Sequence, residues 1–221
     1  MRNIAAEPLK RPSAPSHPRS DDPVRKVQPA ELVGWLTEKG PSITQRWSRE
    51  LKSRYEAPST GVNGLLDEFL STLVRFLPGM LGPYREQVEV VWIRASELFG
   101  AVAVRRGLAA GEVIEEFQIL REALIRHLYL DPPLDGQGEI SLRELLRLNR
   151  VIDTGVTHAS VGHTDALFFA LFQGSGIPDA PPTAELKTEV RSQLRGLEDE
   201  LRDIVGLSSV EGSPEVEPEG H

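Results

Sequence analysis

The stretch VIDTGVTHASVGHTDALFFALF, residues 151–172, places His158, His163 and Asp165 within an apolar segment. Each residue of an α-helix advances by about 100°, so a separation of five residues turns the two histidine rings about 140° apart. Two rings placed in this way on a straight helix cannot bind one metal ion, and Asp165 lies about two turns from His158. We therefore interpret the stretch as a packed helix, with His158 exposed and His163 half-buried, rather than as a metal site.

A row of small side chains on the same helix predicts a close approach by another helix. Gly155, Ala159, Gly162 and Ala166 recur at spacings of four, three and four residues, so they lie on one face. Small side chains let two helix backbones approach closely, either inside a bundle or between the two subunits of a dimer. We favour packing within the bundle, and a dimer contact is the alternative.

Helical periodicity extends from this stretch back to residue 28, with little of the alternation that is typical of strands. Five shorter helices are expected before a long one at residues 141–172, with stops at Gly40 and at Pro78–Gly79. Their expected ranges are 29–40, 41–55, 64–77, 84–106 and 110–130, and a loop is expected at 131–139. Short connections favour antiparallel neighbours, so we predict an all-α fold, a multi-helix bundle or a globin-like stack.

A heptad pattern follows a proline- and glycine-rich linker at residues 174–184. Five apolar residues repeat at spacings of four, three, four and three: Val190, Leu194, Leu197, Leu201 and Ile204. The pattern predicts a separate amphipathic or coiled-coil helix over residues 185–206, about three heptads long. This helix either contacts another chain through its apolar residues or packs back on the domain.

The two ends of the chain have a composition that is typical of disorder. Residues 1–27 are rich in proline, serine and charged residues and carry a net charge of +3, whereas residues 185–221 carry −6. Few apolar groups are available there to offset the entropy of ordering. We expect a disordered arm at 1–27, a helical domain at 28–173 and an acidic disordered tail at 207–221.

Composition also excludes several classes of function. The 221 residues include no cysteine and carry a net charge of −8. The absence of cysteine excludes disulfides and thiolate zinc sites. The negative net charge argues against nucleic acid as the main partner. The longest apolar run, residues 166–172, is far too short to span a bilayer, and the start of the chain has no apolar signal segment. We expect a cytoplasmic protein without a cofactor, a metal ion or a membrane contact.

The sequence shows no recognisable catalytic motif. It has no GxxxxGK[ST] phosphate loop, no complete GxGxxG fingerprint and no GxSxG nucleophile elbow. The acidic pair Glu115 and Glu116 stands near the start of an expected helix, where negative charge is stabilising, so helix structure explains it without catalysis. We therefore predict that the protein is not an enzyme.

Two segments carry a family resemblance. The segment RRGLAAGEVIEEFQILREALIRHL, residues 105–128, followed by LNRVIDTGV, residues 148–156, resembles the N-terminal regulatory domain of the RsbRD type. Domains of that type are helical modules of stressosome co-antagonists and of histidine-kinase sensors. The resemblance extends over residues 43–172, including Trp47 on an early helix.

This resemblance implies a globin-like fold without haem, dimerisation, and control of a switch kinase, a phosphorelay or another stress-response partner. No catalytic residue carries over from the family. The fused output domain that is usual in the family does not follow the linker at residues 174–184. Either the partner is a separate protein that the C-terminal helix recruits, or the chain is a degenerate remnant whose activity is purely binding.

Four polar residues of the family-like segments are candidates for a functional or structural role: Glu116, Arg121, Arg150 and Asp153. Arg150 and Asp153 have the three-residue spacing that favours an ion pair on one helix, whereas Glu116 and Arg121 are five residues apart. Arginines within amphipathic helices commonly pair with such carboxylates, so we interpret these residues as structural pairs.

Two hypotheses for function follow. The first is a non-enzymatic cytoplasmic signalling module, which binds and regulates a protein partner through its helical domain and its C-terminal helix. The alternative is a sensor or carrier that encloses a small molecule or haem in the bundle interior, with His127 or His163 as a contact.

Overall fold

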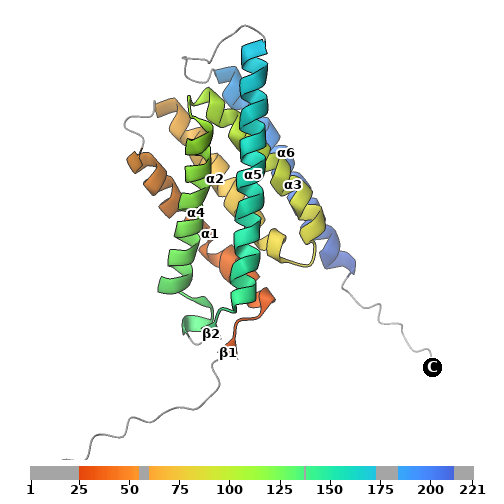
Figure 1. Ribbon diagram of the computed structural model, residues 1–221. Coiled ribbons are helices and arrows are strands. Elements are labelled where there is room, and N and C mark those ends of the chain that lie inside the picture. Colours follow the sequence, from red (N-terminus) through yellow and green to blue (C-terminus); the bar gives the residue numbers. More distant parts are fainter. Residues whose placement is uncertain (1–24, 55–59, 137, 173–183, 212–221) are drawn as a thin grey trace, which may run out of the picture.

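The structure, a computed structural model, describes residues 25–54, 60–136, 138–172 and 184–211. These residues form an all-helical bundle, which confirms the predicted all-α class (Figure 1). The helices are α1 (Pro29–Arg54), α2 (Thr60–Leu81), α3 (Arg85–Arg105), α4 (Ala110–Leu130), α5 (Leu142–Phe172) and α6 (Ala184–Glu211), with a 3-10 turn η1 (Pro133–Gly136). None of the described helices combines the length and the apolar character that a membrane span requires.

Helices α1 and α2 each continue through a proline, Pro41 in α1 and Pro78 in α2. The stops predicted at Gly40 and at Pro78 are therefore wrong, and the two expected helices at the start of the domain form one. An interior proline removes a backbone hydrogen bond and costs about 3 kcal/mol. Packing offsets this cost in α1, because Leu36 and Ile43 on either side of the proline are both buried in the core.

Helices α3 and α5 run side by side in the same direction and approach very closely (Figure 1). A Cβ atom added at Gly100 would lie 1.8 Å from the carbonyl oxygen of Ala159, and one added at Gly162 would lie 2.0 Å from a carbonyl oxygen of α3. A Cβ atom at Gly155 would meet aromatic rings at 2.6 and 2.8 Å. Ala166, the last residue in the row of small side chains, is half-buried. The row therefore packs within the bundle, as favoured from the sequence.

A left-handed glycine ends α3 and turns the chain into α4. Gly107 has a φ of +76°, a conformation that costs little only without a Cβ atom. The N–H of Leu108 donates to the carbonyl of Ala103 at 3.0 Å, and that of Gly107 donates to Val104 at 3.0 Å, the pattern of a glycine-terminated helix. The turn leaves Arg106, the last residue before it, beside the first turns of α4.

Helix α6 packs against α2 and α3 and shares their core. Val190, Leu194 and Leu197 are buried, and Leu201 and Ile204 pack against the same hydrophobic cluster while partly exposed. The alternative in which this helix packs back on the domain is therefore the one that the structure shows. The expected separate C-terminal helix is not confirmed.

The boundaries of the domain differ from those expected. The two-residue strands β1 (Arg25–Lys26) and β2 (Gly138–Glu139) pair in parallel, so the last residues of the predicted arm belong to the domain. Val27, which follows β1, is buried, and its N–H donates to the carbonyl of Glu139 at 3.0 Å. Helix α6 continues to Glu211, past the end predicted at residue 206. The disorder predicted for 1–24 and 212–221, and most of the predicted linker, lie outside the described residues.

The packing of α6 predicts that Leu194→Ala destabilises the whole domain. Leu194 is 4% exposed, and loss of a buried leucine side chain costs about 2–5 kcal/mol. We expect a loss of about 2 kcal/mol in the free energy of unfolding, measured by urea denaturation followed by circular dichroism. Arg195→Ala, at the neighbouring exposed position, is the control and should change stability by less than about 0.5 kcal/mol. Equal stability of the two variants would show that α6 is not part of the folding unit.

Candidate functional site

The two histidines of residues 151–172 have structural partners. His158 is half-buried, with Nδ1 2.9 Å from Glu97 Oε1, so its predicted exposure is wrong. His163 is 5% exposed, more deeply buried than expected, and its Nε2 lies 2.8 Å from the carbonyl oxygen of Leu108. Asp165 is exposed. The described part of the chain contains no cluster of three or more side chains that could hold a metal ion.

Glu116 forms a buried ion pair with Arg106. The carboxylate is fully buried and accepts hydrogen bonds from both terminal nitrogens of the guanidinium, at 2.6 and 2.9 Å. Burial raises the pKa of Glu116 above its ordinary value, and the positive charge of Arg106 lowers it. The indole nitrogen of Trp47 donates to the backbone carbonyl of Glu116 at 2.8 Å. The pair therefore joins the end of α3 to α4 in the core.

Arg121 on α4 pairs with Asp153 on α5, across the interface of the two helices. The pairing predicted between Arg150 and Asp153 is therefore wrong, because a residue on a neighbouring helix takes the carboxylate instead. Arg150 is exposed, and the described residues offer it no carboxylate partner. Three of the four family-like polar residues thus serve structure, and only Arg150 is left outside these pairs.

The interior of the bundle is filled by aromatic rings. Neighbouring ring centres lie 5.3 to 6.4 Å apart. The rings belong to Trp47, Phe69, Trp92, Phe99 and Phe117, all of them buried. His127, one of the two histidines considered as a ligand contact, has its Nδ1 2.9 Å from the carbonyl oxygen of Ala123 on its own helix.

A groove of about 1300 Å³ lies between α1 and α6, over α2. Its lining is mostly apolar and includes Gly40, Val74 and Gly79 on α1 and α2 and Leu201 and Val205 on α6. Pockets for small ligands commonly measure about 300–1,000 Å³, and about three turns of a helix 10 Å across would occupy the volume found here. The size of the groove therefore suits a helix better than a single small molecule.

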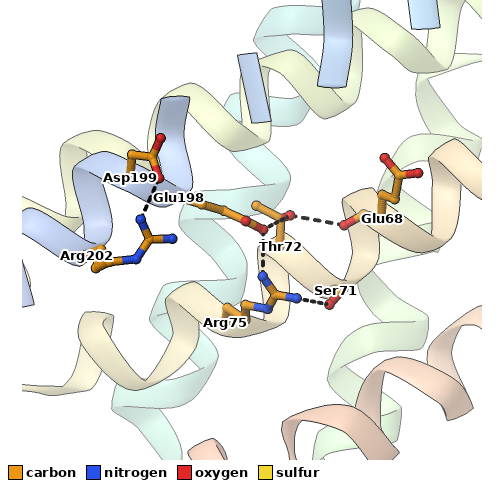
Figure 2. Close-up of polar contacts among 7 residues, drawn as sticks. All are labelled: Glu68, Ser71, Thr72, Arg75, Glu198, Asp199 and Arg202. Carbon is orange, nitrogen blue, oxygen red and sulfur yellow. Dashed lines mark hydrogen bonds and ion pairs between the residues drawn. The ribbon is translucent and has the colours of Figure 1, made fainter. Parts of the chain in front are cut away.

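Polar contacts between α2 and α6 border this groove (Figure 2). Glu198 on α6 accepts hydrogen bonds from Thr72 at 2.5 Å and from Arg75 at 2.9 Å, both on α2. Arg202 donates to Asp199 at 2.6 Å on the same helix. Exposed ion pairs contribute only about 0–1 kcal/mol each, so the buried Val190, Leu194 and Leu197 contribute more to holding α6 on the domain.

Both interior prolines, Pro41 and Pro78, line the groove. In a helix the N–H of each residue donates to the carbonyl four residues earlier, and proline has no N–H. The carbonyls of Thr37 and Val74 therefore lack that intrahelical donor, and both residues also line the groove. The groove thus lies where both helices lack one backbone hydrogen bond. Sequence reasoning missed it because the same prolines were interpreted as helix ends.

A second exposed apolar surface is found at the end of α5. Phe168, Phe169 and Phe172 are 62%, 63% and 83% exposed, and the rings of Phe168 and Phe172 stack with centres 5.8 Å apart. Contiguous exposed aromatic side chains commonly mark contacts with other proteins. The dimerisation expected from the sequence is not tested by the structure of one chain and stays a prediction.

Comparisons with known proteins add no family assignment: no family model matches the chain, and no curated protein or solved structure is significantly similar to it. Function is therefore inferred from the residues and the geometry of the chain itself.

Proposed function

We propose that this protein is a non-enzymatic signalling module that binds and regulates a protein partner, and that an amphipathic helix of the partner occupies the groove between α1 and α6. The single observation that carries the proposal is the groove itself, about 1300 Å³ in volume and mostly apolar. Helix-in-groove docking buries the apolar face of one helix in a preformed hydrophobic channel.

The lining of the groove suits such an occupant. Val74, Leu201 and Val205 provide apolar contact area. The RsbRD-type resemblance and a globin-like helix arrangement are part of the same proposal.

Helix α6 offers a route for regulation. Its Leu201, Arg202 and Val205 line the groove, while Val190 and Leu194, nearer its start, are buried in the domain core. A helix seated in the groove would therefore contact the C-terminal half of α6 and bias its position on α2. Partner binding and the position of α6 are then coupled, because a partner that binds one position of α6 more tightly shifts the helix towards that position.

The alternative of a small molecule or haem in the bundle interior has less support. The aromatic cluster around Phe99 and Phe117 occupies that space, and the imidazole of His163 is engaged by Leu108. A ligand there would have to displace close-packed rings, at a cost of several kcal/mol. A small molecule in the groove is instead an outcome that the experiment below detects.

We expect Thr44→Trp, which fills the groove from α1, to abolish capture of the partner. Thr44 lines the groove, and an indole there occupies space that a docked helix needs. Glu50→Trp is the control, because Glu50 is an exposed residue on another face of α1. The measurement is photo-cross-linking through a benzophenone amino acid at Gln45, an exposed residue of the groove lining, or at position 50, in the cells that make the protein.

The proposal requires a cross-link from position 45 only, to one protein, mapped by mass spectrometry to an amphipathic segment. The yield of that cross-link should fall by at least about tenfold in Thr44→Trp and stay unchanged in Glu50→Trp. Equal cross-linking from both positions would contradict it. Native mass spectrometry of the purified protein provides the second readout. A small molecule retained by the unmodified chain and lost in Thr44→Trp would favour a carrier instead.

A further inference from the structure

A small pocket at one end of the bundle is surrounded by arginines. It measures about 470 Å³ and lies where α3 and α5 begin. Arg85 is the first residue of α3, and Arg143, Arg147 and Arg150 lie within the first turns of α5. Because α3 and α5 run in the same direction, the partial positive charges of both helix N-termini add to the field at this end. The local charge is opposite in sign to the net charge of −8 of the whole chain.

Two of these arginines have neighbouring polar groups, but only one of them is held in place. One terminal nitrogen of Arg147 donates to Glu144 at 2.9 Å, and the other donates to the carbonyl of Leu81 at 3.0 Å. Arg85 lies 3.8 Å from Glu89, beyond hydrogen-bonding distance. The guanidinium of Arg147 is therefore preorganised, whereas that of Arg85 is only loosely engaged.

The other two arginines, Arg143 and Arg150, are exposed, and no carboxylate pairs with them in the residues that the structure describes. Beside them Leu142 and Leu146 are 70% and 48% exposed and face the same pocket. The pocket thus combines guanidinium groups available for an anion with an apolar wall.

We propose that this arginine pocket binds a phosphate monoester whose organic part is apolar. Guanidinium groups bind phosphate oxygens with paired, charge-assisted hydrogen bonds, and a dianion matches two or more arginines better than a single carboxylate does. The leucines would pack against the apolar group next to the phosphate. The site is distinct from the groove, because the two share no lining residue.

Isothermal titration of the full chain with phenyl phosphate and with inorganic phosphate, at low salt, tests the site. We expect phenyl phosphate to bind more tightly, and the double variant Arg143→Gln/Arg150→Gln to weaken it by at least about tenfold. Leu146→Ser should weaken phenyl phosphate but leave inorganic phosphate unchanged. Arg49→Gln, at an exposed position on α1 remote from the pocket lining, is the matched control and should change neither.

Two results would overturn the proposal: binding of phenyl phosphate that is unchanged in the double arginine variant, or binding no tighter than that of inorganic phosphate. Either would mean a general attraction of anions to positive charge. A phosphotyrosine peptide distinguishes the sources of the ligand. Binding of this peptide at least about tenfold tighter than phenyl phosphate assigns the ligand to a protein, and equal binding assigns it to a free phosphate ester. Circular dichroism of each variant verifies that the helices are retained.

Discussion

Gly162→Ala is expected to cost more than about 4 kcal/mol of folding free energy and to lower Tm by at least about 10 °C. The added Cβ atom would lie 2.0 Å from the carbonyl oxygen of Glu97. This oxygen belongs to the backbone of α3, so it cannot move away by a rotamer change as a side-chain atom could. Relief requires α3 and α5 to move apart, which would open the core around Trp92 and Phe117. Domains of this kind are stable by only about 5–15 kcal/mol, so one methyl group removes much of that margin.

The matched control is Gly196→Ala on α6. A Cβ atom added there would meet no atom within 4 Å, and the position is exposed within a helix. Alanine at such a site reduces the entropy of the unfolded chain and should raise stability by about 0.5–1 kcal/mol. Thermal unfolding followed by circular dichroism compares the two. Similar Tm values for both variants would mean that α3 and α5 do not approach as closely as described.

This contact also shows what the sequence can predict. The spacing of Gly155, Ala159 and Gly162 follows from helix geometry alone, so a close approach at this face could be inferred without a structure. The opposing glycine, Gly100, could not be identified in the same way, because its partner residue depends on how two distant helices are aligned along their length. Local periodicity likewise predicted the all-α class and most helix ranges.

The features that were missed depend on contacts between elements. Pro41 and Pro78 end a helix by local rules, yet each helix continues through its proline because residues on both sides of it are buried. Both prolines line the groove. The spacing of Arg150 and Asp153 suggested a pair on one helix, whereas Arg121 from α4 takes that carboxylate. Spacing rules compare residues that are close along the chain. They contain no information on which helices pack against one another.

The buried pair of Arg106 and Glu116 carries the second large prediction. Arg106→Met should cost about 3–5 kcal/mol, because it leaves the fully buried carboxylate of Glu116 without its counter-charge. Arg105→Met is the control, since Arg105 is the exposed neighbour on the same helix and its loss should cost less than about 0.5 kcal/mol. Urea unfolding gives both values, and equal losses would contradict the importance of the buried pair.

The double variant Arg106→Met/Glu116→Leu separates the charge from the packing. Replacing a whole buried ion pair by apolar side chains of similar size is often neutral or stabilising, so we expect the double variant to recover most of the stability that Arg106→Met loses. The hydrogen bond from Trp47 should persist, because it uses the backbone carbonyl of Glu116. A double variant as unstable as the sum of the single variants would mean that the two residues do not interact.

The pH dependence of Arg106→Met provides an independent test of the same charge. Burial already holds the pKa of Glu116 above its ordinary value, and removal of Arg106 takes away the influence that lowers it, so this pKa rises further. At a pH between this raised pKa and the ordinary value of about 4.3, Glu116 is protonated in the native state and ionised in the unfolded chain. The free energy of unfolding of Arg106→Met must therefore increase as the pH falls towards 4.3. The difference in stability between the unmodified protein and Arg106→Met should therefore narrow from pH 7 to pH 5, whereas the difference for Gly162→Ala should stay constant. A constant difference for both variants would mean that Arg106 stabilises the fold through packing and not through its charge.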